Sequence, residues 1–467
     1  MLQEDETSSV TSSPLQFFSM MPFSPGLGSP CPWLKELKSE ERGLYLIHLL
    51  LTCGNHVANG SLEDANISLE QISQLACPKG DTMQRIAAYF AEALADRILK
   101  CWPGLYKALQ FTRTPLVSEE ILGRKLFAEL FPFFKTALVI TNQAITEAME
   151  GEKMIHIIDL NATEPAQWVA LIQALSARPE GPPHLRITGV HHQKEVLEQV
   201  ALRLTQEAEK LDIPFQFNQI VSRLDNLDVE RLRVKTGEAL AISSVLQLHT
   251  VLGYEEGVQF LDKDRASCRH SPINDSSSCS PLSSSASTKM HNFLNALWRL
   301  SPKLMVVTEQ DSNHNSSALM GRLLEALYFY AALFDCLEST LSRTSIERMK
   351  VEKMFFGEEI KNIIACEGAE RKTRHEKMEK WIQRLDMAGF VAVPFSYISM
   401  MQARSLLQGY GCDGYRLKED NRCAVLCWQD RPLYSISAWR CRRMDSYGYG
   451  AEAGLGDKTT RKNLKFY

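Results

Sequence analysis

The residues best placed for chemistry lie in the stretch Met154–Trp168, which reads MIHIIDLNATEPAQW. An apolar run carries Asp159 at its end, a short turn follows, and a helical pattern begins near Ala166. A strand, a turn and a helix in this order build the cofactor-binding corner of many enzymes, where the helix amides and nearby acids contact the ligand. A nucleotide-like cofactor is therefore the first hypothesis for this corner.

The turn after Asp159 argues against that hypothesis. A backbone that approaches a dinucleotide closely needs glycines, and the turn Asn161-Ala-Thr-Glu-Pro165 contains none. Pro165 removes one amide, and Glu164 adds negative charge where a phosphate would bind. Pyrophosphate binding is not expected here.

The second strand of the unit leads to the same expectation for S-adenosylmethionine. Such a site generally has an open glycine-rich turn and an acid at the end of this strand to hold the ribose hydroxyls. After HLRITGV the chain continues with His191, His192 and Gln193, and no acid occurs before Glu195. Neighbours on a strand point to opposite faces, so the two histidines are not expected to share a ligand. We predict no cofactor.

Structural roles account better for the polar residues of the corner. His156 is expected to be one polar group on a strand face, and Asp159 to accept hydrogen bonds from the amides of the next helix. Cys423 and Cys427 have three residues between them in a strand-like run, which favours buried thiols over metal ligands. No GxSxG, P-loop or HExxH pattern occurs. The sequence thus predicts no catalytic, cofactor-binding or metal-binding residues.

The composition is that of a globular chain with a sizeable core. The 467 residues are 45% hydrophobic, and their formal charge of -4 comes from interspersed charges of both signs. Such a balance argues against a large phosphate-binding face. The start of the chain lacks a signal-peptide pattern, and no apolar run approaches the roughly 20 residues of a membrane span. The twelve cysteines are scattered, so we expect a soluble protein of a reduced, intracellular compartment.

The elements that must position the corner follow from periodicity. Helical patterns cover Ser39–Leu99, where apolar residues recur every three or four positions. From Met154 the order is β, α, β, α, β, which predicts a mostly parallel sheet with helices on its faces. The predicted strands are MIHIID, HLRITGV, PFQFNQIV, residues 238–246, residues 303–310 and a hairpin over 423–439 with the turn Gln429–Pro432.

Three segments lack such patterns. Residues 1–37 are rich in serine and proline and are expected to form a disordered leader. Residues 267–289 are Ser-rich and poor in apolar residues, which predicts a disordered insertion loop. Residues 442–467 gain glycine and lose periodicity, so a disordered tail is expected.

Taken in order, the motifs of the chain resemble the plant GRAS family over about residues 38–441. Glu41–Lys100 resembles its first leucine-rich region and Leu197–Ile213 its second, while Leu246–His249 matches an LQLH element and stretches within residues 301–381 match the PFYRE region. The residues that resemble the family's VHIID motif are Met154, Ile155, His156, Ile157, Ile158, Asp159, Gln167 and Trp168, and its closing SAW block matches Ser437, Ala438 and Trp439.

The chain departs from the family pattern at two places. Members commonly carry a glycine before the Gln-Trp pair, where this chain has Glu164-Pro165-Ala166. The PFYRE region has Glu358 where arginine is usual. The first departure weakens a cofactor role further, and the second puts any role of that arginine in doubt.

The resemblance implies a Rossmann-like, methyltransferase-like α/β core over about 150–441 with an α-helical cap over about 38–130. It also implies a plant nuclear coregulator of transcription that acts through protein contacts in gibberellin signalling and in root and endodermis development. The implied partners are DELLA proteins, which it would antagonise, INDETERMINATE DOMAIN zinc-finger transcription factors, which would bring it to promoters, and other GRAS chains in homo- or heterodimers. Two alternatives stay open, a direct sequence-specific DNA binder and a residual S-adenosylmethionine-binding protein.

Two further motifs have competing interpretations. Leu46, Leu49 and Leu50 fit an LxxLL pattern that can enter a partner's groove, although packing within the cap suits so apolar a helix better. The basic run Arg371–Lys377 could favour nucleic acid, but Glu376 interrupts it, which favours a solvated helix face.

Overall fold

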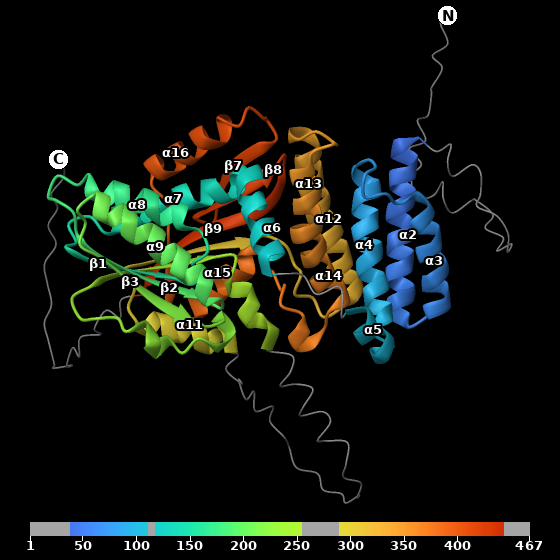
Figure 1. Cartoon of the computed structure of the whole chain (residues 1–467), viewed down its shortest axis with the longest axis horizontal. Helices are drawn as coiled ribbons and strands as arrows, with labels where there is room; N and C mark the ends of the chain where they lie inside the picture. The colour runs from blue at the N-terminus through green and yellow to red at the C-terminus, as the bar shows by residue number, and fades with distance from the viewer. Residues whose placement is uncertain (1–37, 111–116, 255–288, 443–467) are drawn as a thin grey trace, which may run out of the picture.

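The computed structural model describes residues 38–110, 117–254 and 289–442 (Figure 1). The predicted leader, the predicted insertion up to residue 288 and the predicted tail beyond Arg442 lie outside these ranges. None of the described helices combines the length and apolar character needed to cross a membrane.

Helices dominate the first part of the chain. They are α2 (Ser39–Asn59), α3 (Leu62–Leu75), α4 (Thr82–Leu99), α5 (Pro103–Gln110), α6 (Val117–Leu130) and α7 (Pro132–Ala148). Helices from much later in the chain, α12 (Leu319–Thr340), α13 (Ile346–Val351) and α14 (Glu358–Ala365), stand beside α4 and lie between it and the strands (Figure 1). A π-helical turn, η5 (Glu352–Gly357), joins α13 to α14. The helical cap is thus assembled from two distant parts of the sequence.

A single mixed sheet forms the core. Within the described residues its strands are β1 (Met154–Asp159), β2 (His184–His191), β3 (Phe215–Val221), β4 (Ala239–Val245), β5 (Leu304–Gln310), β6 (Phe390–Val393), β7 (Tyr415–Asp420), β8 (Cys423–Trp428) and β9 (Arg431–Cys441). The order is β3-β2-β1-β4-β5-β9-β8-β7, with β6 also paired to β9. The first five strands are parallel, and β9 is antiparallel to β5. The predicted Rossmann-like, mostly parallel sheet is confirmed.

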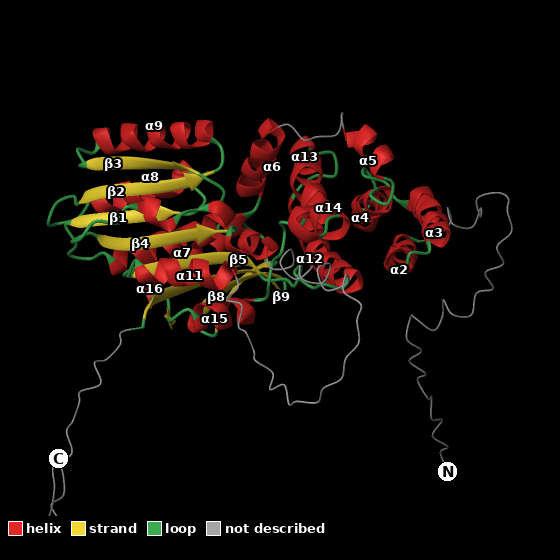
Figure 2. Ribbon diagram, turned by 90° about the horizontal axis from the view of Figure 1, so that it is seen from below, coloured by secondary structure: helices red, strands yellow, loops and turns green. Residues whose placement is uncertain are grey.

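Helices cover both faces of this sheet, as Figure 2 shows from below. The connecting helices are α8 (Pro165–Ser176), α9 (Lys194–Lys210), α11 (Lys289–Arg299), α15 (Met378–Met387) and α16 (Tyr397–Gln408), with short 3-10 turns η2 (Leu224–Asn226), η3 (Val229–Leu232), η4 (Leu248–Tyr254) and η6 (Gly368–Glu370). Ile155 and Ile157 of β1 pack into the core shared with α7 and α8, whereas Ile158 packs into the core shared with α11. A strand buried on both faces must be apolar along nearly its whole length, which is why MIHIID and its neighbours could be predicted.

The carboxyl-terminal strands differ from the prediction in two ways. The hairpin turn consists of Gln429 and Asp430 alone, because Arg431 and Pro432 already belong to β9. Gln429 adopts a φ of 52°, which closes the hairpin with two residues. Strands β6 and β7 were not predicted, since β6 has four residues and β7 is a mostly exposed edge strand with charged residues.

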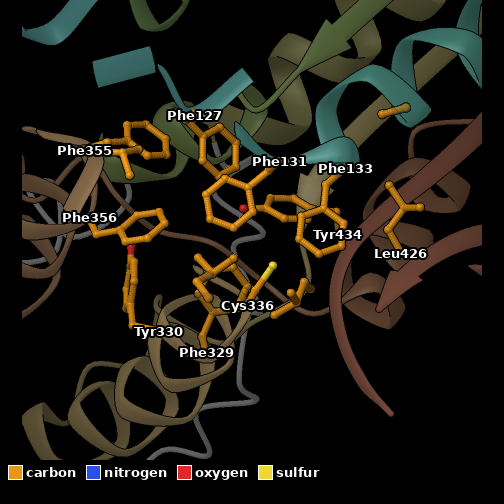
Figure 3. Packing of buried hydrophobic residues seen from close by; sticks show 14 of the residues in the cluster. Phe127, Phe131, Phe133, Phe329, Tyr330, Cys336, Phe355, Phe356, Leu426 and Tyr434 are labelled. Atoms are coloured by element: carbon orange, nitrogen blue, oxygen red, sulfur yellow. The ribbon is translucent and has the colours of Figure 1, made fainter. Parts of the chain in front are cut away.

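Aromatic side chains join the helices to the sheet. Phe127 of α6 lies 4.7 Å from Phe355 and 6.2 Å from Tyr434 of β9, between ring centroids. Phe131 lies 5.8 Å from Phe356, and all five rings are buried. Figure 3 shows these rings gathered at one junction together with Phe329 and Tyr330 of α12. Burial of large rings at one junction gives these elements a fixed relative position.

Charged groups are buried at the same junction. Glu352 of η5 accepts hydrogen bonds through one carboxylate oxygen from Arg85 of α4 at 3.1 Å and from Arg348 of α13 at 3.0 Å. All three side chains are fully buried, and Arg85 also reaches Glu338 of α12 at 2.9 Å. The network therefore ties α4 to the later helices.

Substituting Glu352→Gln should lower the free energy of unfolding by about 3 to 5 kcal/mol, because two buried guanidinium groups lose their counter-charge. Urea denaturation followed by circular dichroism would measure the change. The matched control is Glu419→Gln, which breaks the solvent-exposed ion pair with Arg404 and should change stability little. Equal losses in both variants would contradict a structural role for the buried network.

Candidate functional site

The corner formed by β1 and α8 is closed by Asp159. Its Oδ2 accepts a hydrogen bond from the indole Nε1 of Trp168 at 2.7 Å, and its Oδ1 accepts one from the amide of Asn161 at 2.9 Å. Asp159 and Trp168 are both buried. Burial raises the pKa of Asp159 to about 6, while the two hydrogen bonds lower it.

The expectation that Asp159 would bind the amides of the next helix is wrong. The first turn of α8 is capped by Glu164, whose carboxylate accepts from the amide of Ala166 at 3.1 Å. Asp159 lies on the face of β1 that meets α8, so its nearest donor is the Trp168 indole rather than a helix amide. Both carboxylate oxygens of Asp159 therefore accept hydrogen bonds from groups within the protein.

The remaining residues of the VHIID-like motif are mostly internal. Ile155, His156, Ile157, Ile158 and Gln167 are buried, whereas Met154 is 44% exposed. His156 hydrogen bonds Thr188 at 2.8 Å and lies 2.9 Å from an Arg186 nitrogen. Burial and the Arg186 charge lower the pKa of His156 to about 4, so its ring is neutral at neutral pH. In the folded chain only Met154 of this motif presents a sizeable surface to a partner.

The two adjacent histidines do not diverge as expected. His191 is the last residue of β2 and His192 follows it outside the strand, where alternation no longer applies. Their ring centroids are 4.4 Å apart. Within the described residues, however, no group of three or more His, Cys, Asp or Glu side chains could hold a metal ion.

The prediction that Cys423 and Cys427 are buried thiols is confirmed. Cys423 and Cys427 are buried in β8, and neither forms a disulfide. Burial raises the pKa of the Cys423 thiol to about 12. Both side chains are therefore protonated, apolar packing groups.

A cleft of about 810 Å³ lies where the parallel strands end. Its floor consists of residues at or just after the ends of β1, β2, β3 and β4, namely Leu160, His191, His192, residues 222–225, Leu246, Gln247, His249 and Thr250. Its roof comes from the helices α6, η5 and α14. Because the strand order reverses between β1 and β4, the cleft lies at the topological switch point, where α/β sheets generally bind ligands.

The residues at the corner do not fit S-adenosylmethionine. The β2 end offers His191 where an acid would hold ribose hydroxyls, and the side chains of Leu160 and Ala162 are buried in the turn that would have to stay open. The acid that follows β3, Asp225, is paired with Arg223 at 3.1 Å.

The sequence indicated no site role for His249, which lines this cleft, or for its buried partner Glu309. His249 Nδ1 lies 2.8 Å from Glu309 Oε2, and Glu309 is 1% exposed near the end of β5. The available signal was an acid near the end of a buried strand, the same signal that identified Asp159. Only the fold shows that residues 60 positions apart meet here.

The other predicted motifs are also internal. Leu46, Leu49 and Leu50 are buried in the core of the helical cap, so packing, rather than an exposed LxxLL surface, is their arrangement in the folded chain. Ser437, Ala438 and Trp439 of β9 are likewise buried, and the Trp439 indole donates to Ser437 Oγ at 2.8 Å.

The expected solvated helix face over Arg371–Lys377 is wrong. No helix forms there, and Arg371, Arg374 and His375 are buried. Arg374 donates to the backbone carbonyl of Gly368 at 3.0 Å, and Arg371 to that of His314 at 3.0 Å. These guanidinium groups satisfy carbonyls of an irregular segment, which a charge count along the sequence cannot detect. Neither arginine offers a face to nucleic acid.

Comparison with known proteins identifies similar proteins over most of the chain. Residues 46–440 match the GRAS domain family. The chain is 64% identical to Scarecrow-like protein 3 of Arabidopsis thaliana over 95% of its own length and 99% of that protein. It is 34% identical to DELLA protein RGL1 of Arabidopsis thaliana, over 88% of this chain and 72% of that one. The crystal structure of SCL7 from Oryza sativa has a TM-score of 0.68 and 29% identity, covering 85% of this chain and 99% of that chain.

Substituting Trp168→Phe should destabilise the fold by about 1 to 3 kcal/mol near neutral pH, because Asp159 keeps its burial but loses the indole donor. Without that donor the folded-state pKa of Asp159 rises further, so more of the carboxyl group is protonated as the pH falls below about 6. The loss should therefore be largest above pH 6 and smaller near pH 4. Urea titrations across this pH range would measure it, and a loss independent of pH would contradict the assignment.

Proposed function

Because the chain belongs to the GRAS family, we propose that it is a plant nuclear coregulator of transcription that acts through protein-protein contacts. The observation that carries this proposal is the near full-length identity to Scarecrow-like protein 3. The methyltransferase-like corner supports a role without catalysis, since the Asp159 carboxylate is hydrogen bonded to Trp168 and Asn161 and no acid stands at the end of β2.

The proposed pathway is gibberellin signalling, together with root and endodermis development. In this proposal the protein antagonises DELLA repressors, with which it shares the GRAS domain, and reaches promoters through INDETERMINATE DOMAIN zinc-finger proteins. Similarity to DELLA protein RGL1 over most of the chain supports competition for common partners, because similar surfaces can bind the same protein.

Direct DNA binding has less support. A direct binder generally presents a basic stripe, whereas the formal charge here is -4. The arginines of the basic run, Arg371 and Arg374, are buried. DNA contacts are therefore assigned to the zinc-finger partner.

We expect the purified protein to bind a promoter fragment only in the presence of an INDETERMINATE DOMAIN partner. Alone it should bind DNA only non-specifically, with a dissociation constant of about 10⁻⁴ to 10⁻⁶ M. Adding it to the DNA-bound partner should give a slower-migrating complex. Electrophoretic mobility shifts measure both, and a fragment with a scrambled zinc-finger site is the control.

Two results would contradict this proposal. Sequence-specific DNA binding by the protein alone, with a steep salt dependence, would favour the DNA-binding alternative. Micromolar binding of S-adenosylmethionine in calorimetry would instead favour a residual methyltransferase-like role.

A further inference from the structure

We propose that the cleft at the strand ends binds a small organic acid. The carboxylate of the ligand is held by His249, Lys372 and Thr373, which together form the His249 wall of the cleft. This inference concerns a ligand site and goes beyond the coregulator role.

His249 is fixed by a buried acid. Glu309 Oε2 pairs with His249 Nδ1 at 2.8 Å, while its Oε1 accepts from the amides of Gln247 at 3.0 Å and Leu248 at 2.7 Å. An imidazole whose one nitrogen is held by a carboxylate has its ring orientation set and can carry a proton on the other nitrogen. The Nε2 atom makes no hydrogen bond with another described residue, and the side chain lines the cleft.

The segment that carries His249 is strained. Leu246 has a φ of 52°, a left-handed conformation that is unfavourable for a residue with a Cβ. Its amide donates to Thr308 at 2.8 Å, so the conformation is held by β5. A π-helical turn, η5, forms part of the roof opposite. Both irregularities are of the kind that occurs at functional sites.

The wall beside His249 offers further donors. The His249 ring lies 4.1 Å from the ring of His375, which brings the preceding residues Lys372 and Thr373 to the same cleft. Lys372 is exposed and forms no ion pair with another described residue. An imidazole, a hydroxyl and an ammonium group together suit an anionic head group.

Two carboxylates of the cleft are held by protein partners. Asp225 is paired with Arg223 at 3.1 Å, and Glu359 accepts from the Tyr330 hydroxyl at 2.8 Å. Lys361 forms ion pairs with both Glu92 and Glu358. Because one ammonium group faces two carboxylates, that part of the roof is acidic. We therefore place the ligand carboxylate at the His249 wall rather than near Lys361.

Apolar and polar side chains together line the rest of the cleft. Leu160, Val190, Leu224, Met354 and Phe355 line it, and its volume is within the roughly 300 to 1,000 Å³ of small-molecule sites. A phosphate is the less suitable anion, because no glycine occurs among the described residues that line the cleft, so no glycine-rich turn presents its amides there. The geometry thus favours a carboxylic acid over a phosphate.

Saturation-transfer NMR on the full 467-residue chain tests this assignment. The probes are 1-naphthoate and cyclohexanecarboxylate, each compared with its primary amide, which has the same shape but no charge. The acids should bind at least about tenfold more tightly than the amides, the size expected for a charge-assisted hydrogen bond.

His249→Phe keeps a ring against His375 but removes Nε2, and should weaken acid binding about tenfold while leaving amide binding unchanged. The matched control is His184→Phe, an exposed histidine at the opposite end of β2 that should have no effect. Because His249 is nearly buried, its variant could lose the fold; Lys372→Gln, at an exposed position, should then weaken acid binding severalfold on its own. Equal binding of acids and amides, or acid binding unchanged in Lys372→Gln and in a folded His249→Phe protein, would overturn the proposal.

Discussion

The structure depends on the aromatic cluster that joins the helical cap to the sheet. Phe127 of α6 and Phe131, which lies between α6 and α7, meet Phe355 and Phe356 of η5, and Tyr434 of β9 lies against Phe127. Aromatic pairs of this kind contribute about 0.5 to 1.5 kcal/mol each beyond the area they bury. Three stretches far apart in the chain therefore have one fixed arrangement, and the cleft lies directly beside it.

Buried charges refine the position that the rings establish. Arg85 and Arg348 both donate hydrogen bonds to Glu352. Glu359 accepts a hydrogen bond from Tyr330, and burial raises the pKa of the Glu359 carboxyl group. Such groups are costly to bury without partners, so they tolerate few alternative packings. The helices that roof the cleft are consequently held by directional contacts as well as by apolar area.

The corner at β1 shows how a cofactor-binding geometry can serve a structural purpose. The strand, turn and helix are retained, but Asp159 points at Trp168 and the turn is filled by Leu160 and Ala162. The acid that in an enzyme would face a ligand here fastens α8 to the sheet. The strand ends still leave a cleft, because that space comes from the reversal of strand order and not from the turn.

The sequence by itself determined the parallel sheet and its helices. Strands buried on both faces, such as MIHIID and HLRITGV, must be continuous apolar runs, and those runs are visible without coordinates. It also showed that the glycines for a cofactor were absent. It missed β7, because a mostly exposed edge strand with charged residues has no comparable signal.

Only the tertiary structure decided where the polar residues point. The arginines at 371 and 374 looked like a solvated face, yet each is buried against backbone carbonyls that an irregular segment leaves unsatisfied. The pairing of His249 with Glu309 was equally hidden, since it joins residues 60 positions apart. Apolar periodicity is a local property of the chain, whereas the partner of a buried charge is chosen by whichever distant segment the fold brings beside it.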